Sequence, residues 1–349
     1  MKRKFLPVLA LSLLLSACTA PIQPTPTSEP TSVPQANETL LAMDTVMQLT
    51  VYGDNATAAL SAAKSEILAM ENRLSVTLEG SDIWKLNHSE GQPVTVGDDA
   101  VFLLETARDL GDKTGGALDV TLYPVVKAWG FTTGEYQIPP EDTIASLLGR
   151  VDYTALSWEG NDVTLPAGME MDLGAIAKGY AGERAADILR DNGVTSALLN
   201  MGGNVQTVGA KPDGTAWRIG IRDPQKSATD YLGVLSVIDQ AVVTSGGYER
   251  FFEEDGVRYW HIMDPKTGAP ARSGLTAVTI VSHSGALCDG LSTSLFVMGL
   301  EKASDYWREQ GDFEAIFINE ENEVWITPGL RDSFSLTQNS GYTLHIVEE

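Results

Sequence analysis

Short strand-like segments joined by glycine-containing turns dominate the second half of this chain. The first two turns, residues 201–204 and 211–214, are each only a few residues long. Short strands separated by such turns are typical of an antiparallel meander, so we expect the first three strands to lie side by side in chain order. The segments that read as strands here are residues 195–200, 205–208, 217–221, 232–239, 241–244, 259–262 and 275–282.

Helical and strand-like periodicities are mixed along the whole chain without regular strand–helix–strand alternation. The expected helices cover residues 55–74, 100–114, 140–148, 172–191 and 286–300. Asp172 is expected to cap the fourth helix, and Asn192-Gly193 is expected to end it. Further strands are expected at residues 45–52, 315–318 and 323–326. This order predicts an α+β fold with mixed, largely antiparallel sheets and packed helices, in one globular unit of two intimate lobes.

The N-terminus is typical of an exported protein. Lys2, Arg3 and Lys4 precede an apolar run over residues 5–15, which is too short for a stable membrane span. The run ends in Leu-Ser-Ala-Cys18, which is similar to the bacterial lipobox. That similarity implies a signal peptide at residues 1–17, cleavage before Cys18 and lipidation of that cysteine. The alternative is an ordinary signal peptide in which Cys18 is incidental.

A tether is expected to follow the signal. Residues 18–39 are rich in proline, threonine and serine and nearly lack large apolar groups, so they cannot bury a core. The globular domain is therefore expected over residues 40–349, which is enough chain for one large domain. Cys288 is the only cysteine besides Cys18, so lipidation of Cys18 would leave no intramolecular disulfide.

The chain is strongly acidic, with a formal net charge of −23. Removal of the predicted signal, which is basic and holds no acidic residue, makes the charge more negative. No basic cluster then remains, which argues against nucleic-acid binding and against electrostatic docking on anionic lipid. An acidic protein that binds an anionic ligand needs local compensation from a divalent cation or from a few placed lysine and arginine residues.

One face of the expected helix at residues 286–300 carries a possible metal site. Asp289, Ser292 and Thr293 are three or four residues apart and therefore project together. Mg²⁺ prefers hard oxygen ligands and often takes one carboxylate, with substrate phosphates and water completing the shell. The alternative interpretation is an aspartate cap followed by small polar residues that pack against a neighbouring element.

A second segment, residues 172–182, allows two interpretations. Its small residues at a helix start would let a phosphate approach backbone N–H groups, and Lys178 would lie nearby. They could equally serve close packing alone. Neither a P-loop nor a dinucleotide-binding glycine motif is present. His261, one of four histidines, could be a buried structural residue or a general base.

Taken in order, these motifs resemble the ApbE-type FAD:protein FMN transferase family over residues 41–329. The segments that carry the resemblance are residues 42–45, 75–87, 114–121, 129–131, 172–180, 200–204, 244–246, 259–268 and 289–293. Asp44, Gly247, Cys288 and Gly290 depart from the residues common at these positions, although none of them replaces an expected metal ligand. We interpret Cys288 as a small buried residue rather than a nucleophile.

The resemblance implies a fold, a reaction and a set of site residues. The enzyme would have the flavin transferase fold, cleave FAD, transfer FMN to a threonine or serine hydroxyl of an acceptor protein, and release AMP. Mg²⁺, with Mn²⁺ as the alternative, would be held by Ala175, Asp289, Ser292 and Thr293. FAD would contact Met43, Ala117, Leu118, Asp119, Asp172, Lys178 and Ile262. His261 would be the catalytic base for the acceptor hydroxyl.

The resemblance also implies partners and a location. The acceptors would be flavin-binding subunits of membrane redox complexes. Lipid on Cys18 would tether the enzyme to the bilayer, on the extracytoplasmic face of a bacterial cell membrane. Two rival functions remain open from the sequence: a Mg²⁺-dependent FAD pyrophosphatase that gives FMN and AMP, and a flavin-binding lipoprotein without catalysis.

Overall fold

The computed structural model describes residues 33–227 and 229–348. The predicted signal peptide, Cys18 and most of the predicted tether lie outside the described residues. From Val33 onward the chain forms one compact unit. Within the described residues, no helix is both long enough and apolar enough to cross a bilayer.

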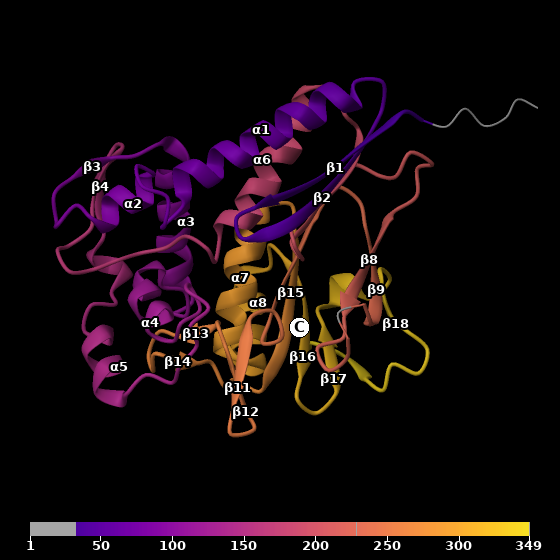
Figure 1. The fold of residues 1–349 in the computed structure, drawn as a ribbon. Coiled ribbons are helices and arrows are strands. Elements are labelled where there is room, and N and C mark those ends of the chain that lie inside the picture. The colour runs from indigo at the N-terminus through magenta and orange to yellow at the C-terminus, as the bar shows by residue number, and fades with distance from the viewer. Residues whose placement is uncertain (1–32, 228, 349) are drawn as a thin grey trace, which may run out of the picture. The chain divides into compact units, whose positions relative to one another are not determined.

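A nine-stranded sheet forms the centre of this unit (Figure 1). Its strands follow the order β1-β2-β6-β7-β10-β15-β16-β17-β19. Every neighbouring pair is antiparallel except β17 and β19, which are parallel. The strands are β1 (Gln35–Ala42), β2 (Thr45–Tyr52), β6 (Ser196–Asn200), β7 (Val205–Val208), β10 (Ala241–Gly246), β15 (Leu275–Ser282), β16 (Glu314–Asn319), β17 (Glu323–Ile326) and β19 (Thr343–Ile346). The predicted α+β class with largely antiparallel sheets is confirmed.

The predicted meander is wrong in its third strand. Strand β7 pairs with β10 rather than with β8, and β8 joins a separate three-stranded sheet. The physical reason is side-chain burial, since Trp217 at the start of β8 packs in a second apolar cluster with Leu235 and Phe334. The strands outside the central sheet are β3 (Val94–Thr95), β4 (Ser157–Glu159), β5 (Asp162–Thr164), β8 (Trp217–Arg222), β9 (Tyr231–Val237), β11 (Phe251–Glu254), β12 (Val257–Trp260), β13 (Met263–Asp264), β14 (Ala269–Pro270) and β18 (Phe334–Leu336).

The first strand begins before the predicted start of the globular domain. Strand β1 pairs with β2 along its whole length, so the predicted boundary at residues 39 and 40 falls inside a strand. The first residues of β1 are polar and carry no apolar signal. Its later residues Leu40 and Ala42 are buried, and backbone pairing extends the strand back to Gln35. As an end strand of the sheet, β1 can be polar on its exposed positions.

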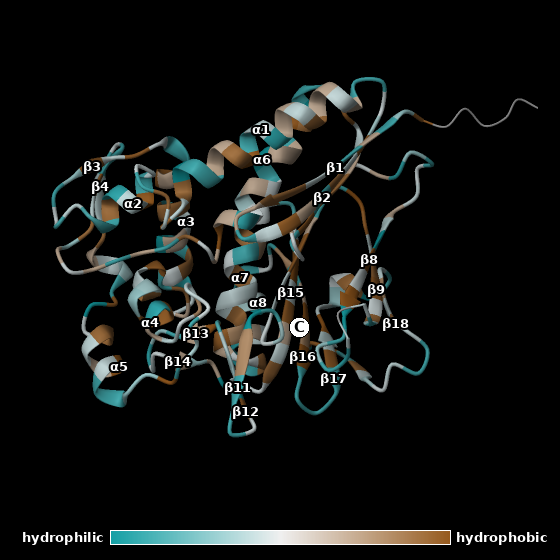
Figure 2. Cartoon of the chain, in the orientation of Figure 1, coloured by the Kyte–Doolittle hydropathy of each residue, from teal (hydrophilic) through white to brown (hydrophobic). Residues whose placement is uncertain are grey.

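Helix α7 (Gly285–Met298) is the buried helix of the fold. It packs on β10 and β15 on one side and contacts α3 (Asp98–Lys113), α6 (Ala177–Asp191) and α8 (Leu300–Gln310) on others. Figure 2 shows hydrophobic residues concentrated in the central strands beside it, and both β15 and β16 are almost wholly buried. The remaining helices are α1 (Ala56–Leu74), α2 (Asp82–Asn87), α4 (Tyr123–Ala128) and α5 (Glu141–Leu148).

Cys288 on α7 is buried and unpaired within the described residues. Burial and the neighbouring Asp289 carboxylate raise the pKa of its thiol, which disfavours the reactive thiolate. This agrees with the interpretation of Cys288 as a small packing residue.

Candidate active site

The segment from Asp172 to Ile176 is a turn, not the start of a helix. Helix α6 begins at Ala177, so the prediction that Asp172 caps it is wrong. The Asp172 carboxylate instead accepts a hydrogen bond of 2.6 Å from the backbone N–H of Gly174. Aspartate readily closes such a local turn, and here this bond competes successfully with helix capping.

Helices α6 and α7 cross in direct backbone contact at two glycines. A Cβ atom on Gly179 would lie 2.0 Å from the carbonyl oxygen of Gly285, and one on Gly285 would lie 2.2 Å from the carbonyl oxygen of Gly179. Both positions therefore require glycine. This approach brings Asp289 against the first turn of α6, where its Oδ2 accepts a 2.8 Å hydrogen bond from Gly179 N–H. The carboxylate satisfies an N-terminal donor of the helix that the helix itself cannot pair.

A cluster of hydroxyl groups lies one turn further along α7. Ser245 Oγ on β10 lies 2.8 Å from Ser292 Oγ and 3.2 Å from Thr293 Oγ1. Ser292 also donates to the carbonyl oxygen of Asp289 at 2.9 Å. The structure thus brings Asp289, Ser292 and Thr293 together as their spacing predicts. It adds Ser245, which sequence reasoning did not select although it lies within the 244–246 motif.

A cavity of about 200 Å³ opens beside Thr293 and Ser245. It is lined by nine of the predicted site residues: Ala117, Leu118, Asp119, Asp172, Ala175, Lys178, His261, Ile262 and Thr293. Asp289 and Ser292 are not in its lining; Asp289 is only 4% exposed, and Ser292 lies next to the cavity through its contact with Ser245. The predicted site residues, distant in the sequence, therefore converge on one place.

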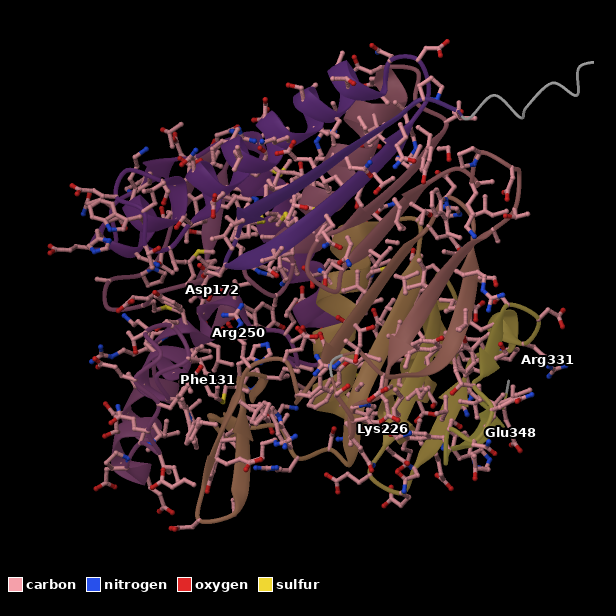
Figure 3. The ribbon with its side chains drawn as sticks, turned by 45° about the vertical axis from the view of Figure 1, so that its right-hand side comes forward. Phe131, Asp172, Lys226, Arg250, Arg331 and Glu348 are labelled. Carbon is pink, nitrogen blue, oxygen red and sulfur yellow. The ribbon has the colours of Figure 1, made fainter. Side chains whose placement is uncertain are left out.

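A second cavity of about 240 Å³ adjoins the first and contains Met43, the remaining predicted contact. The two cavities share Phe131, Asp172, Lys178 and Arg250 among their walls, so they are two chambers of one cleft. Figure 3 labels three of these shared residues and shows them near one another. A cleft of two chambers suits an elongated ligand with two ends.

Two cations lie where the chambers meet. Lys178 Nζ donates to the carbonyl oxygen of Gly174 at 3.3 Å, and the Arg250 side chain has no hydrogen bond or ion pair among the described residues. Burial raises the pKa of Asp172, whereas the nearby charges of Arg250 and Lys178 oppose that rise. Burial likewise raises the pKa of Glu249. Arg250 and Glu249 were missed from the sequence, although both lie within four residues of the 244–246 motif.

His261 lies at the break between β12 and β13, because the strand predicted over residues 259–262 ends at Trp260. Its Nδ1 is 3.3 Å from the carbonyl oxygen of Arg250. Burial, followed by the positive charges of Arg250 and Lys178, lowers the pKa of His261 to about 3. The imidazole is therefore neutral at neutral pH, and the same shift makes it a weaker base than a free imidazole.

Asp119 has a structural role in addition to its place in the cavity wall. One carboxylate oxygen accepts from the backbone N–H of Thr121 at 2.8 Å and from its hydroxyl, while the other accepts from Tyr153 N–H at 3.1 Å. Both oxygens are thus engaged in holding the turn before α4. Burial raises the pKa of this carboxyl.

The chemistry of the site fits a Mg²⁺ ion shared with a phosphate ligand rather than a metal held by the protein alone. Within the described residues, no group of three or more histidine, cysteine and acidic side chains could hold a metal ion. The donors that do gather are Asp289, the hydroxyl cluster and the Ala175 segment of the cavity wall. Asp289 Oδ1 makes no hydrogen bond in the described part of the chain. A single carboxylate with hydroxyl and carbonyl oxygens is the incomplete set that Mg²⁺ fills with phosphates and water.

Comparison with known proteins gives consistent matches. The sequence model of the ApbE family matches residues 43–317. An FAD:protein FMN transferase of Treponema pallidum is 35% identical, over 84% of this chain and 86% of the relative. An FAD:protein FMN transferase of Klebsiella pneumoniae is 36% identical, over 78% of this chain and 85% of the relative. The crystal structure of the ApbE protein from Thermotoga maritima superposes with a TM-score of 0.78 at 30% identity, covering 83% of this chain and 96% of that one. The flavin transferase ApbE from Vibrio cholerae superposes with a TM-score of 0.74 at 26% identity, covering 87% and 97%.

Proposed function

Because this chain belongs to the ApbE family, we propose that it is an FAD:protein FMN transferase that moves FMN from FAD to a hydroxyl of an acceptor protein. The relatives that it matches over most of their length carry that activity in their names. The observation that supports it most directly is the two-chambered cleft with Lys178 and Arg250 at its junction. In a chain of net charge −23, these cations offer an anionic pyrophosphate a local positive site.

The residues in the cleft suggest how FAD would lie. Ala117, Leu118 and Ile262 give one chamber an apolar wall, and Met43 contributes to the other. Lys178, whose side chain starts in the second residue of α6, would bind phosphate oxygens with its ammonium group. Holding the substrate in one position is the main task of a protein that catalyses phosphoryl-type transfer.

Asp289 and Thr293 would hold Mg²⁺, or Mn²⁺ as the alternative, with Ser292 and the Ala175 carbonyl in support. The metal would offset negative charge on the pyrophosphate as AMP leaves. The Gly179 N–H fixes one oxygen of Asp289, and Ser245 fixes the hydroxyls of Ser292 and Thr293. These hydrogen bonds would keep the donors oriented before the substrate arrives, which lowers the reorganisation needed in the reaction.

His261 is the proposed base that takes the proton from the acceptor hydroxyl. Replacing it in the variant His261→Asn should slow transfer by about 10²-fold or more, since general-base catalysis contributes on that scale. The dissociation constant of FAD should change little. Single-turnover transfer rates and FAD titration measure the two quantities separately.

The pH profile provides a second readout of this role. Because the pKa of His261 is about 3, its neutral form already dominates above that pH, and the wild-type rate should show no limb near the ordinary histidine value of about 6.5. Weaker FAD binding with an unchanged transfer rate in His261→Asn would remove the base assignment.

The transferase proposal is tested by the intact mass of an acceptor subunit after incubation with the enzyme, FAD and Mg²⁺, with and without EDTA. A metal-dependent gain of one FMN moiety is the expected result. Cleavage of FAD to FMN and AMP without mass gain would favour the pyrophosphatase. Intact FAD that remains bound would favour a flavin-binding protein without catalysis.

The proposed location is the extracytoplasmic face of a bacterial cell membrane, with the enzyme held there by lipid on Cys18 beside flavin-binding subunits of membrane redox complexes. The variant Cys18→Ser should shift the protein from the membrane to the soluble fraction, because two or more acyl chains supply the affinity for the bilayer. Fractionation after labelling with radioactive palmitate measures both the lipid and the location. Membrane retention of an unlabelled Cys18→Ser protein would contradict the anchor.

A further inference from the structure

A third cavity, of about 430 Å³, lies outside the proposed active site. This third cavity and the first cavity of the active site share a wall. Gly247 and Tyr248 line the third cavity, whereas Gly246, Glu249 and Arg250 line the first. Residues 246–250, which begin with the last residue of β10, thus have one cavity on each side. The lining is unlike the rest of this acidic protein: aromatic rings alternate with cations.

Two donors in this lining have no partner among the described residues. Arg222 Nε and Trp260 Nε1 are both buried from solvent and unpaired, and Trp260 as a whole is 8% exposed. A buried donor without an acceptor is costly, and native proteins pair nearly all of them. Both residues line the cavity, so a small local rearrangement would let a ligand with acceptor oxygens pair these donors.

The cations of the cavity are partly pre-positioned. The Arg222 guanidinium lies 4.3 Å from the centre of the Tyr248 ring, and Arg258 lies 4.1 Å from that of Phe251. Arg258 also pairs with Glu253 at 2.9 Å, whereas Arg222 has no ion pair in the described part of the chain.

Lys226 completes the positive side of the cavity. It pairs with Asp223 at 3.0 Å, and Glu320 is the one acidic residue of the lining. Arg222 is the cation of this lining that makes no ion pair among the described residues, although the buried Glu249 carboxyl lies near enough to interact with its charge.

We propose that this cavity anchors an acidic side chain, flanked by an apolar or aromatic one, from the acceptor protein. The inference rests on the proposed transferase function, which requires a protein substrate. FAD would fill most of the active-site cleft, so the acceptor needs a binding site beside that cleft. On a surface this acidic, an acidic acceptor would be repelled everywhere except where cations gather, and charge complementarity of this kind selects and orients partners.

The first test measures binding without catalysis. The probes are a fluorescently labelled, terminally blocked peptide Asp-Glu-Phe-Glu and its uncharged counterpart Asn-Gln-Phe-Gln. The acidic peptide should bind saturably, and the uncharged one should bind at least about tenfold more weakly. The free energy of a hydrogen bond to a charged group corresponds to a difference in affinity of about that size. Fluorescence anisotropy measures both. Absence of binding, or equal binding of the two peptides, would overturn the proposal.

Variants locate the binding. Arg222→Gln should lower the affinity for the acidic peptide by about tenfold or more, and Lys226→Gln should lower it by a smaller factor. Lys226 is half exposed but pairs with the buried Asp223, so the free energy of unfolding of both variants is measured beside the affinity. Arg331→Gln removes the same charge from an exposed position outside this cavity and is the matched control. Wild-type affinity in both cavity variants would place the peptide elsewhere and end the proposal.

Transfer kinetics separate this proposal from the function on which it rests. With an acceptor subunit that the wild type modifies, Arg222→Gln should raise the acceptor KM about tenfold while kcat and FAD affinity stay unchanged. A fall in kcat of about tenfold with no change in KM would count against a docking role for Arg222. If no acceptor is ever modified, the transferase proposal fails while the peptide result still stands on its own.

Discussion

Asp289→Ala is expected to lower flavin transfer by about 10³-fold or more, because it removes the proposed metal ligand and the group that fixes the first turn of α6. The fold should survive. A lost hydrogen bond to a buried charge costs about 1–3 kcal/mol, which is a fraction of the 5–15 kcal/mol that stabilises a typical domain. Transfer rate and the free energy of unfolding, measured on the same protein, separate the two effects.

Asp289→Asn is the matched control for this experiment. The amide oxygen can still accept from Gly179 N–H, but the charge that binds a divalent cation is gone. We expect near-wild-type stability together with the same loss of transfer. Full turnover in Asp289→Asn would mean that the carboxylate serves only to join the two helices, and the metal assignment would be withdrawn.

Gly179→Ala is expected to destabilise the protein by about 3 kcal/mol or more. The new Cβ atom would lie 2.0 Å from the carbonyl oxygen of Gly285 and 2.7 Å from Cβ of Asp289. The first neighbour is backbone, so relief requires the two helices to separate. Separation would also pull Asp289 away from the Gly179 N–H, and transfer should fall together with stability.

Gly182→Ala, one turn further along the same helix, isolates the cause. Its Cβ would meet Gln206 and Met201 side chains at 3.5 Å, an ordinary contact distance. Alanine is favoured over glycine in a helix by up to about 1 kcal/mol, so this variant should be as stable as the wild type or more stable. Chemical denaturation compares the two. Similar stabilities for both variants would show that the helix crossing tolerates a side chain.

Local periodicity was sufficient to predict the long elements of this fold. The amphipathic pattern of residues 55–74 and the apolar run of 275–282 became α1 and β15 with nearly the expected bounds. The misassignments arose where two local structures compete or where pairing is non-local. Asp172 could cap a helix or close a turn, and the local sequence does not show which of these two structures is more stable. The partner of β8 depends on where Trp217 finds apolar neighbours far along the chain.

The same distinction applies to the site. Asp289, Ser292 and Thr293 share a helix face, so their convergence follows from spacing alone. Ser245 and Arg250 reach the site only because β10 lies against α7, which no local pattern reveals. The need for glycine at residues 179 and 285 was equally hidden, because each is required only in the presence of the other.

The crossing of α6 and α7 makes the assembled site a property of the docked helices. The residues at 179 and 289 are far apart in the chain, and their hydrogen bond forms only when both helices have docked. A chain that is still unfolded holds no assembled set of donors for a flavin nucleotide. Ligand would therefore bind the native state alone and stabilise it by mass action. Substrate binding would in this way favour the native state over incompletely folded states.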